Sequence, residues 1–180
     1  MLSFFDAFLI LFVGLAAGFD LRERRIPNWL ILFALTAGVL LNFWKGLPQL
    51  SESVLGFLLG MGIFIVPFVL GWVGAGDVKF VGAVGAVLGV SLIPRVIFYS
   101  ALLGGVLALT AVMLRGANLQ AFHSTWRDVK LLVMSRGAIL PETISEKSRQ
   151  GVHTIPFGVA IAVGTLVTFY VDPQGEWARF

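Results

Sequence analysis

Long apolar stretches dominate this chain of 180 residues and leave few folds open to it. Hydrophobic residues make up 58% of the chain and charged residues 13%, against roughly 25% charged residues in a soluble domain. Several of the runs are long enough to cross the hydrocarbon core of a bilayer as helices. We therefore predict an all-α, polytopic membrane protein, a bundle of six transmembrane helices at 2–19, 29–44, 54–73, 80–94, 96–114 and 152–171.

Two of these assignments rest on local signals. Pro94 and Arg95 separate the fourth span from the fifth, because proline disfavours helix in the residue before it and arginine resists burial. The first run has no basic segment ahead of it and no small-residue cleavage site, so we expect a retained helix and not a signal peptide.

The distribution of basic residues predicts the orientation of the bundle. With the N-terminus outside, the cytoplasmic segments hold 10 of the 13 lysines and arginines, and the external segments hold Lys45, Arg95 and Arg179. Cytoplasmic loops of membrane proteins carry such an excess of positive charge. We therefore expect both termini outside, in a multi-pass protein of the inner (cytoplasmic) membrane. The net charge of +3 is explained by this orientation and does not indicate nucleic acid.

One long polar segment interrupts the apolar pattern. We expect a single membrane-embedded domain over 1–180 with a cytoplasmic loop at about 115–151. Apolar residues recur in this loop at helical spacing, which predicts an amphipathic helix lying against membrane lipid; they are Leu119, Phe122, Trp126, Val129 and Leu132. A soluble cap on the bundle is the alternative.

Pairs of glycines four residues apart predict close helix packing. Each pair places two small residues on one helix face, where two backbones can approach closely. The pairs are Gly14 and Gly18, Gly56 and Gly60, and Gly85 and Gly89.

The chain contains no cysteine, which excludes disulfides, thiolate catalysis and cysteine-ligated zinc. Its two histidines, His123 and His153, lie 30 residues apart and do not indicate a metal site. We expect neither a metal nor another cofactor.

Two aspartates stand out against this background. Asp20 closes the first apolar run, and Asp77 follows Gly74 and Gly76 in a Gly-x-Gly-Asp-x-Lys sequence that ends at Lys79. Ionisable groups at a bilayer boundary are costly, and they indicate function by default. The two glycines would let the backbone leave the helix at membrane depth and approach a peptide closely. The topology places both carboxyls at the cytoplasmic face, although 57 residues separate them.

Each aspartate taken alone has a simpler explanation. Asp20 could pair with Arg22 or Arg24 as an ordinary boundary carboxylate, and glycine-rich turns such as the one before Asp77 are common. Two neighbouring carboxyls that share a proton, in contrast, are the chemical apparatus of an aspartic protease.

Together the motifs resemble the type IV prepilin peptidase family, the bacterial members of the GxGD class of intramembrane aspartic proteases. In that family one catalytic aspartate ends the first helix ahead of an Ile-Pro-Asn turn, as Asp20 precedes Ile26-Pro27-Asn28 here. The other belongs to a Gly-x-Gly-Asp-x-Lys motif, as Asp77 does. A third similarity is the Pro-Phe-Gly segment at the last helix, here Pro156, Phe157 and Gly158.

The chain also departs from the larger family members. Those carry a cytoplasmic domain with paired cysteines between the first helices and also N-methylate the pilin. Here only 22–28 joins the first two spans. The resemblance therefore implies the short form associated with Flp/Tad-type pilus systems, a peptidase without the methyltransferase domain; archaeal preflagellin peptidases form a related branch.

The resemblance implies an aspartic endopeptidase that removes the cytoplasmic leader of type IV prepilins, with Asp20 and Asp77 activating water. Supporting or substrate-binding roles then fall to Gly74, Gly76, Lys79, Pro156, Phe157 and Gly158. Lys79 could instead extend to lipid headgroups, and Pro156 to Gly158 could simply start and pack a helix. The rival hypotheses are a small transporter or channel that uses the aspartates as ion sites, and a scaffold that has lost activity.

Overall fold

The computed structural model describes residues 4–69, 73–115 and 157–171 of the chain. In this part of the chain every regular element is a helix, as predicted. The helices are α1 (Phe4–Glu23), α2 (Asn28–Lys45), α3 (Leu47–Val69), α4 (Ala75–Leu88), α5 (Ile93–Arg115) and α8 (Phe157–Tyr170). The loop at 115–151 and its predicted amphipathic helix lie, beyond Arg115, outside the described residues.

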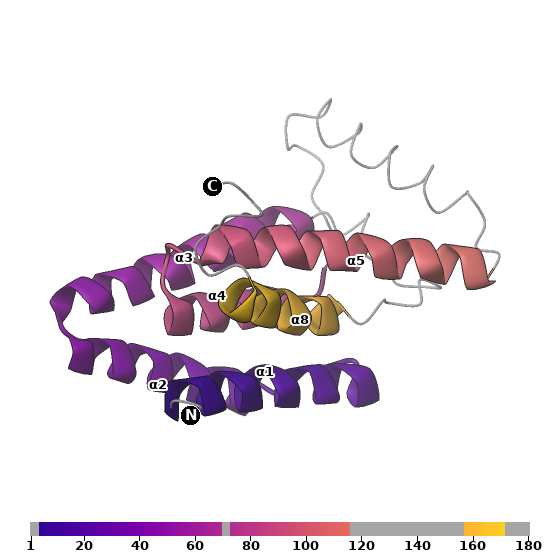
Figure 1. Cartoon of the computed structure of the whole chain (residues 1–180). Helices are drawn as coiled ribbons and strands as arrows, with labels where there is room; N and C mark the ends of the chain where they lie inside the picture. Colours follow the sequence, from indigo (N-terminus) through magenta and orange to yellow (C-terminus); the bar gives the residue numbers. More distant parts are fainter. Residues whose placement is uncertain (1–3, 70–72, 116–156, 172–180) are drawn as a thin grey trace.

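The helices pack in three layers. Figure 1 shows α4 and α8 in the middle, between α1 and α2 on one side and α3 and α5 on the other. The middle helices make the main contacts of the bundle, because α4 packs against α2 and α3 while α8 packs against α1 and α5. The C-terminal end of α1 and the N-terminal ends of α2, α4 and α8 lie at one end of the bundle, where Gly158 contacts Asp20 and Lys79 bonds Asn28.

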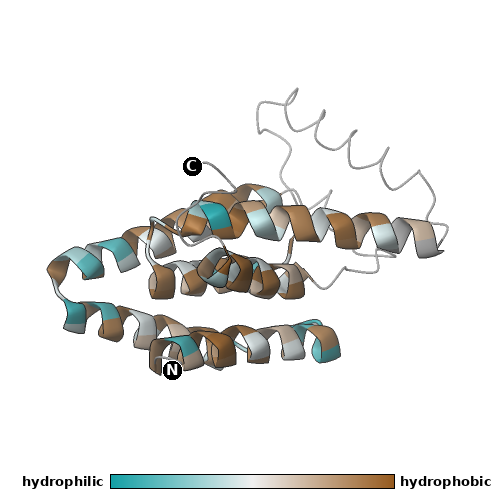
Figure 2. Ribbon diagram, viewed as in Figure 1, coloured by the Kyte–Doolittle hydropathy of each residue, from teal (hydrophilic) through white to brown (hydrophobic). Residues whose placement is uncertain are grey.

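Four of the described helices are long and apolar enough to cross a membrane: α1, α2, α3 and, within α5, Ile93–Thr110. Figure 2 shows hydrophobic residues along their length and hydrophilic ones gathered near the turn between α2 and α3. A multi-pass membrane protein is therefore indicated. Helices α4 and α8 have 14 residues each, or about 21 Å at 1.5 Å per residue. That length falls short of a 30 Å hydrocarbon core, so the six-span count stays a prediction.

Several of the predicted helix boundaries are wrong. Helix α4 begins at Ala75 and not at the predicted position 80. Helix α3 begins 7 residues before the predicted position 54, because the polar residues of its first turns are compatible with helix. The fourth helix ends at Leu88, and the break before α5 is made by Gly89, whose φ of +88° a residue with a side chain rarely adopts. Pro94 lies in the first turn of α5 and not in the break, since a helix needs no N–H donor there.

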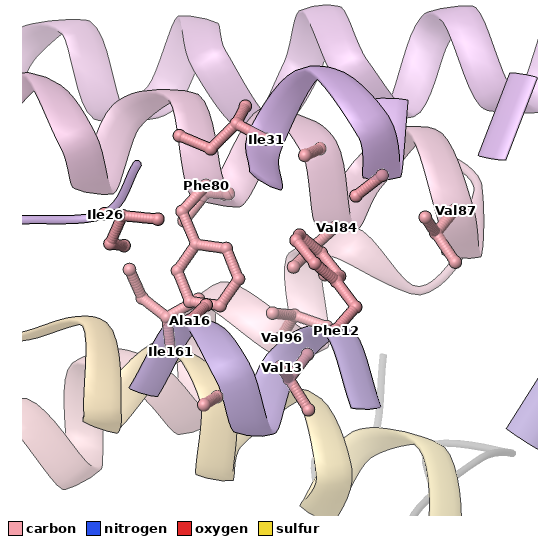
Figure 3. Close-up of a cluster of buried hydrophobic side chains, with 14 of the residues drawn as sticks. Phe12, Val13, Ala16, Ile26, Ile31, Phe80, Val84, Val87, Val96 and Ile161 are labelled. Carbon is pink, nitrogen blue, oxygen red and sulfur yellow. The ribbon is translucent and has the colours of Figure 1, made fainter. Parts of the chain in front are cut away.

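The core lies around α4. Phe80 is fully buried, and its ring meets that of Phe12 edge to face with the centroids 5.4 Å apart. Figure 3 shows this pair among aliphatic side chains that come from distant parts of the sequence, including Ile26, Ile31 and Ile161. Side chains from α1, the α1–α2 turn, α2 and α8 thus converge on one face of α4.

Glycines allow α3 and α4 to approach each other as predicted. A Cβ added at Gly56 would clash with the carbonyl oxygen of Gly85, and one added at Gly60 would lie 2.8 Å from the carbonyl oxygen of Val81. Among the described residues the same prediction is wrong for Gly14 and Gly18, where a Cβ would have no atom of this part of the chain within 4 Å. Glycine spacing alone does not say which face of a helix meets a neighbour.

The C-terminal end of α4 is buried, and other helices supply its hydrogen-bond partners. The Asn42 side chain of α2 donates to the carbonyl oxygens of Ala86 and Val87 at 3.0 and 3.2 Å. The Ser53 hydroxyl of α3 donates to Ala86 at 2.6 Å. These bonds satisfy carbonyls that a helix leaves without an internal partner.

Candidate active site

Asp20 lies on the buried face of α1, in its last turn. The buried residues of α1 recur at helical spacing and end with this aspartate: Leu9, Phe12, Val13, Ala16 and Asp20. Only 7% of Asp20 is exposed. A position that a core residue would normally occupy is thus filled by a carboxyl group at one end of the bundle.

The first turn of α8 packs directly against this carboxyl. A Cβ added at Gly158 would lie 2.8 Å from Oδ2 of Asp20 and 2.9 Å from its Cγ. The carboxyl therefore lies at the N-terminal end of α8, where the helix dipole favours a negative charge. Oδ2 of Asp20 is buried and has no hydrogen-bond partner among the described residues. A reacting molecule could supply that partner.

Asp77 occupies the third position of α4, not a break ahead of the helix. Its Oδ2 accepts a hydrogen bond from the backbone N–H of Gly74 at 3.0 Å, which caps the start of the helix. Gly74 has an extended backbone with φ of −80° and ψ of 157°, and Gly76 is helical. The expected glycine-only backbone is therefore wrong at both positions.

The two aspartates lie at the same end of the bundle although they come from different helices. Asp20 lies in the last turn of α1, and Asp77 lies in the first turn of α4, where Gly76 faces Ile26 of the α1–α2 turn. Asp77 is half-buried and Asp20 almost fully buried. Burial from water strengthens the interaction between two charges, which disfavours the doubly ionised state of the pair.

The α1–α2 turn lies against the start of α4. Gly76 faces Ile26, because a Cβ added at Gly76 would lie 3.8 Å from the Ile26 nitrogen. The ammonium group of Lys79 donates to Oδ1 of Asn28 at 3.1 Å. The sequence motifs around Asp20 and Asp77 therefore contact each other through residues other than the aspartates.

The remaining predicted site residues have separate surroundings. Gly158 lies at Asp20, whereas the Phe157 ring packs on Gly104 of α5 and lies 6.0 Å, centroid to centroid, from the Phe64 ring of α3. Pro156 lies outside the described residues. Sequence reasoning did not single out Asn28, although the Ile-Pro-Asn turn that contains it was part of the pattern.

Fold and site together define a helical membrane protein with two carboxyls at one end of its bundle. The sequence model of the type IV leader peptidase family matches residues 7–109, a stretch that includes both aspartates. The chain belongs to the type IV leader peptidase family. The Pro156 to Gly158 segment lies beyond the matched stretch.

Curated relatives carry the name prepilin leader peptidase/N-methyltransferase. Those of Aeromonas hydrophila and Aeromonas salmonicida are 32% identical over 120 residues, which cover 61% of this chain and 40% of the relative. That of Burkholderia pseudomallei is 29% identical over 99 residues, or 51% of this chain and 32% of the relative. The chain thus aligns with less than half the length of these relatives. No solved structure shows a significant match.

The α1–α2 connection agrees with the short form of the family. Helix α1 ends at Glu23 and α2 begins at Asn28, so only 4 residues join them. A connection of this length cannot hold a domain between the first two helices.

Proposed function

We propose that this protein is an intramembrane aspartic endopeptidase that removes the leader peptide from type IV prepilins. The observation that carries the proposal is the presence of two carboxyls at one end of the bundle: Asp20 is buried in the last turn of α1, and Asp77 lies in the first turn of α4, against which the α1–α2 turn lies. Both belong to the stretch matched by the family. The names of the relatives supply the substrate class, prepilin. We propose a prepilin of the Flp/Tad type because the α1–α2 connection is short.

The chemistry follows from a carboxyl pair that holds one proton. The ionised member removes a proton from a water molecule, and the oxygen of that water attacks the scissile carbonyl carbon. The protonated member donates a hydrogen bond to the carbonyl oxygen and so stabilises the tetrahedral intermediate. The C–N bond then breaks, the leaving nitrogen takes up a proton, and a carboxylic acid and an amine result.

The orientation of the site completes the proposal. The α1–α2 turn carries Arg24 and Arg25 at the same end of the bundle as the aspartates, and this end is proposed to face the cytoplasm. The leader of a prepilin is cytoplasmic and precedes an apolar helix. A junction between a polar leader and an apolar helix would reach the carboxyls at the surface of the inner membrane.

Cleavage by the purified protein tests the proposal. The protein in liposomes is mixed with a prepilin, and removal of the leader is followed by gel shift and mass spectrometry. We expect cleavage by the wild type and a loss of at least about 10³-fold in Asp20→Asn and in Asp77→Asn, because an amide cannot exchange the proton that the reaction needs.

Asp6→Asn is the matched control. It makes the same chemical change on the same helix, 14 residues or about 21 Å from Asp20, and should leave cleavage intact. A folded wild type that moves protons across the liposome membrane without cutting prepilin would replace the peptidase proposal by a transporter.

A further inference from the structure

We propose that Asn28 and Lys79 are positioning residues that hold the α1–α2 turn on the start of α4 and thereby align Asp20 with Asp77. This inference rests on the proposed peptidase function. Its direct evidence is the 3.1 Å hydrogen bond from the Lys79 ammonium to Oδ1 of Asn28, which joins positions 51 residues apart. The contact of Gly76 with Ile26 lies beside it.

Lys79 is placed to hold the turn and not to neutralise Asp77, which lies two positions before it in the sequence. Residues two positions apart on a helix point to different faces, so Lys79 and Asp77 do not face each other. Asp77 instead accepts a hydrogen bond from Gly74 of its own helix. The Lys79 side chain reaches across to the first residue of α2.

A short segment transmits this anchor to Asp20. Only 4 residues lie between α1 and α2, and within them the backbone N–H of Arg24 donates to the Asp20 carbonyl oxygen at 3.0 Å. Arg24 has a φ of +52°, an unusual value for a residue with a side chain, which fixes the direction in which the chain leaves α1. A displacement of Asn28 would therefore move the end of α1.

The helix packing makes such an anchor necessary. Helix α1 packs mainly against α8, whereas α4 packs mainly against α3 and α2. The aromatic contact of Phe12 with Phe80 lies two turns of α1 away from Asp20. The relative position of the two carboxyls is thus set through neighbouring elements, and the Asn28–Lys79 pair is a direct bond between the two motif segments.

Steady-state cleavage of prepilin by Asn28→Ala, Lys79→Met, the double variant and Asn28→Asp tests this inference. We expect kcat to fall about 10-fold to 100-fold in each of the first two with KM unchanged, because misplacement of catalytic groups slows the chemical step. The kcat of the double variant should lie within roughly twofold of the kcat of the slower single variant, because both substitutions remove the same interaction. Asn28→Asp should restore the rate, because its carboxylate still accepts from Lys79.

Asn42→Ala is the matched control, since Asn42 lies on the same helix as Asn28 and bonds the opposite end of α4. It should lower the thermal stability while leaving kcat of the folded protein unchanged. Any of three results would overturn the inference: a wild-type kcat in Asn28→Ala, multiplicative losses of kcat in the double variant, or a change in KM confined to Lys79→Met. Failure of the wild type to cleave prepilin would refute the proposed function instead, which keeps the two outcomes apart.

Discussion

At the scale of single residues, Gly158 shows how a missing side chain can shape an active site. It lies against the Asp20 carboxyl in the first turn of α8, where the helix dipole favours a negative charge. Any larger residue would occupy the space next to Oδ2. Nothing in the backbone conformation of Gly158 demands glycine, so the requirement comes from the contact with Asp20.

We predict that Gly158→Ala abolishes most of the cleavage while the protein still folds. The new Cβ would lie 2.8 Å from Oδ2, so the side chain of Asp20 must move while the backbone stays in place. A shift of about 1 Å at a catalytic group costs about 100-fold in rate. Initial rates of prepilin cleavage and thermal unfolding in detergent are the two measurements.

Gly105→Ala is the control for this substitution, because a Cβ at Gly105 would have no atom within 4 Å in the part of the chain that the structure describes. It should keep the wild-type rate. A Gly158→Ala variant with full activity would show that Asp20 tolerates the displacement and that the contact has no catalytic consequence.

At the scale of elements, α4 is a buried helix that packs mainly against α2 and α3. Its residues from Val78 to Val87 are all buried except Lys79. Neighbouring helices provide glycines where its backbone approaches and polar side chains where its carbonyls end. In an apolar surrounding, small residues and interhelical hydrogen bonds of this kind hold helices together.

We predict that Gly56→Ala lowers the free energy of unfolding by about 1–3 kcal/mol, the range for an overpacked interior. The added Cβ would meet backbone atoms of Gly85 and Gly89, which cannot move without separating α3 from α4. Unfolding of the purified protein in mixed micelles by increasing SDS measures the effect.

The matched variant is Gly62→Ala on the same helix α3. A Cβ at Gly62 would have no atom of the described residues within 4 Å, so this variant should be as stable as the wild type or slightly more stable. Equal losses of stability in both variants would show that the α3–α4 contact does not decide the result.

At the scale of the whole molecule, the bundle has two chemically different ends. The α1–α2 turn with Arg24 and Arg25 lies at the end that holds the aspartates. At the other end the Lys45 ammonium lies 4.5 Å from the centroid of the Phe5 ring, which brings the end of α2 beside the start of α1. Figure 1 shows the corresponding hairpin of α1 and α2.

The proposed orientation predicts which end a membrane-impermeant maleimide reaches. The chain has no cysteine, so single cysteines at two exposed positions, Arg25→Cys and Lys45→Cys, can be labelled without background. In spheroplasts Lys45→Cys should react at once and Arg25→Cys only after the membrane is permeabilised. The reverse pattern would place the aspartates outside and contradict the cleavage of a cytoplasmic leader.

Much of this arrangement could be predicted from the sequence because bilayer and backbone physics constrain apolar runs strongly. The helical structure of the apolar runs follows from the need to satisfy every backbone polar group in lipid. The two aspartates stood out since a charged group in such a run is costly. The positions of helix ends were less accurate, as at α3 and at the α4–α5 break, because polar residues and proline are compatible with the first turn of a helix.

Only the tertiary structure decided which residues meet. Glycine spacing predicted the face of α3 that packs on α4 and failed for Gly14 and Gly18, because periodicity gives a face but not its neighbour. The bond between Asn28 and Lys79 and the contact of Gly158 with Asp20 join positions far apart in the chain. The sequence by itself determined the helices and the unusual carboxyls, since those depend on local composition; their alignment depends on long-range packing, which local composition does not encode.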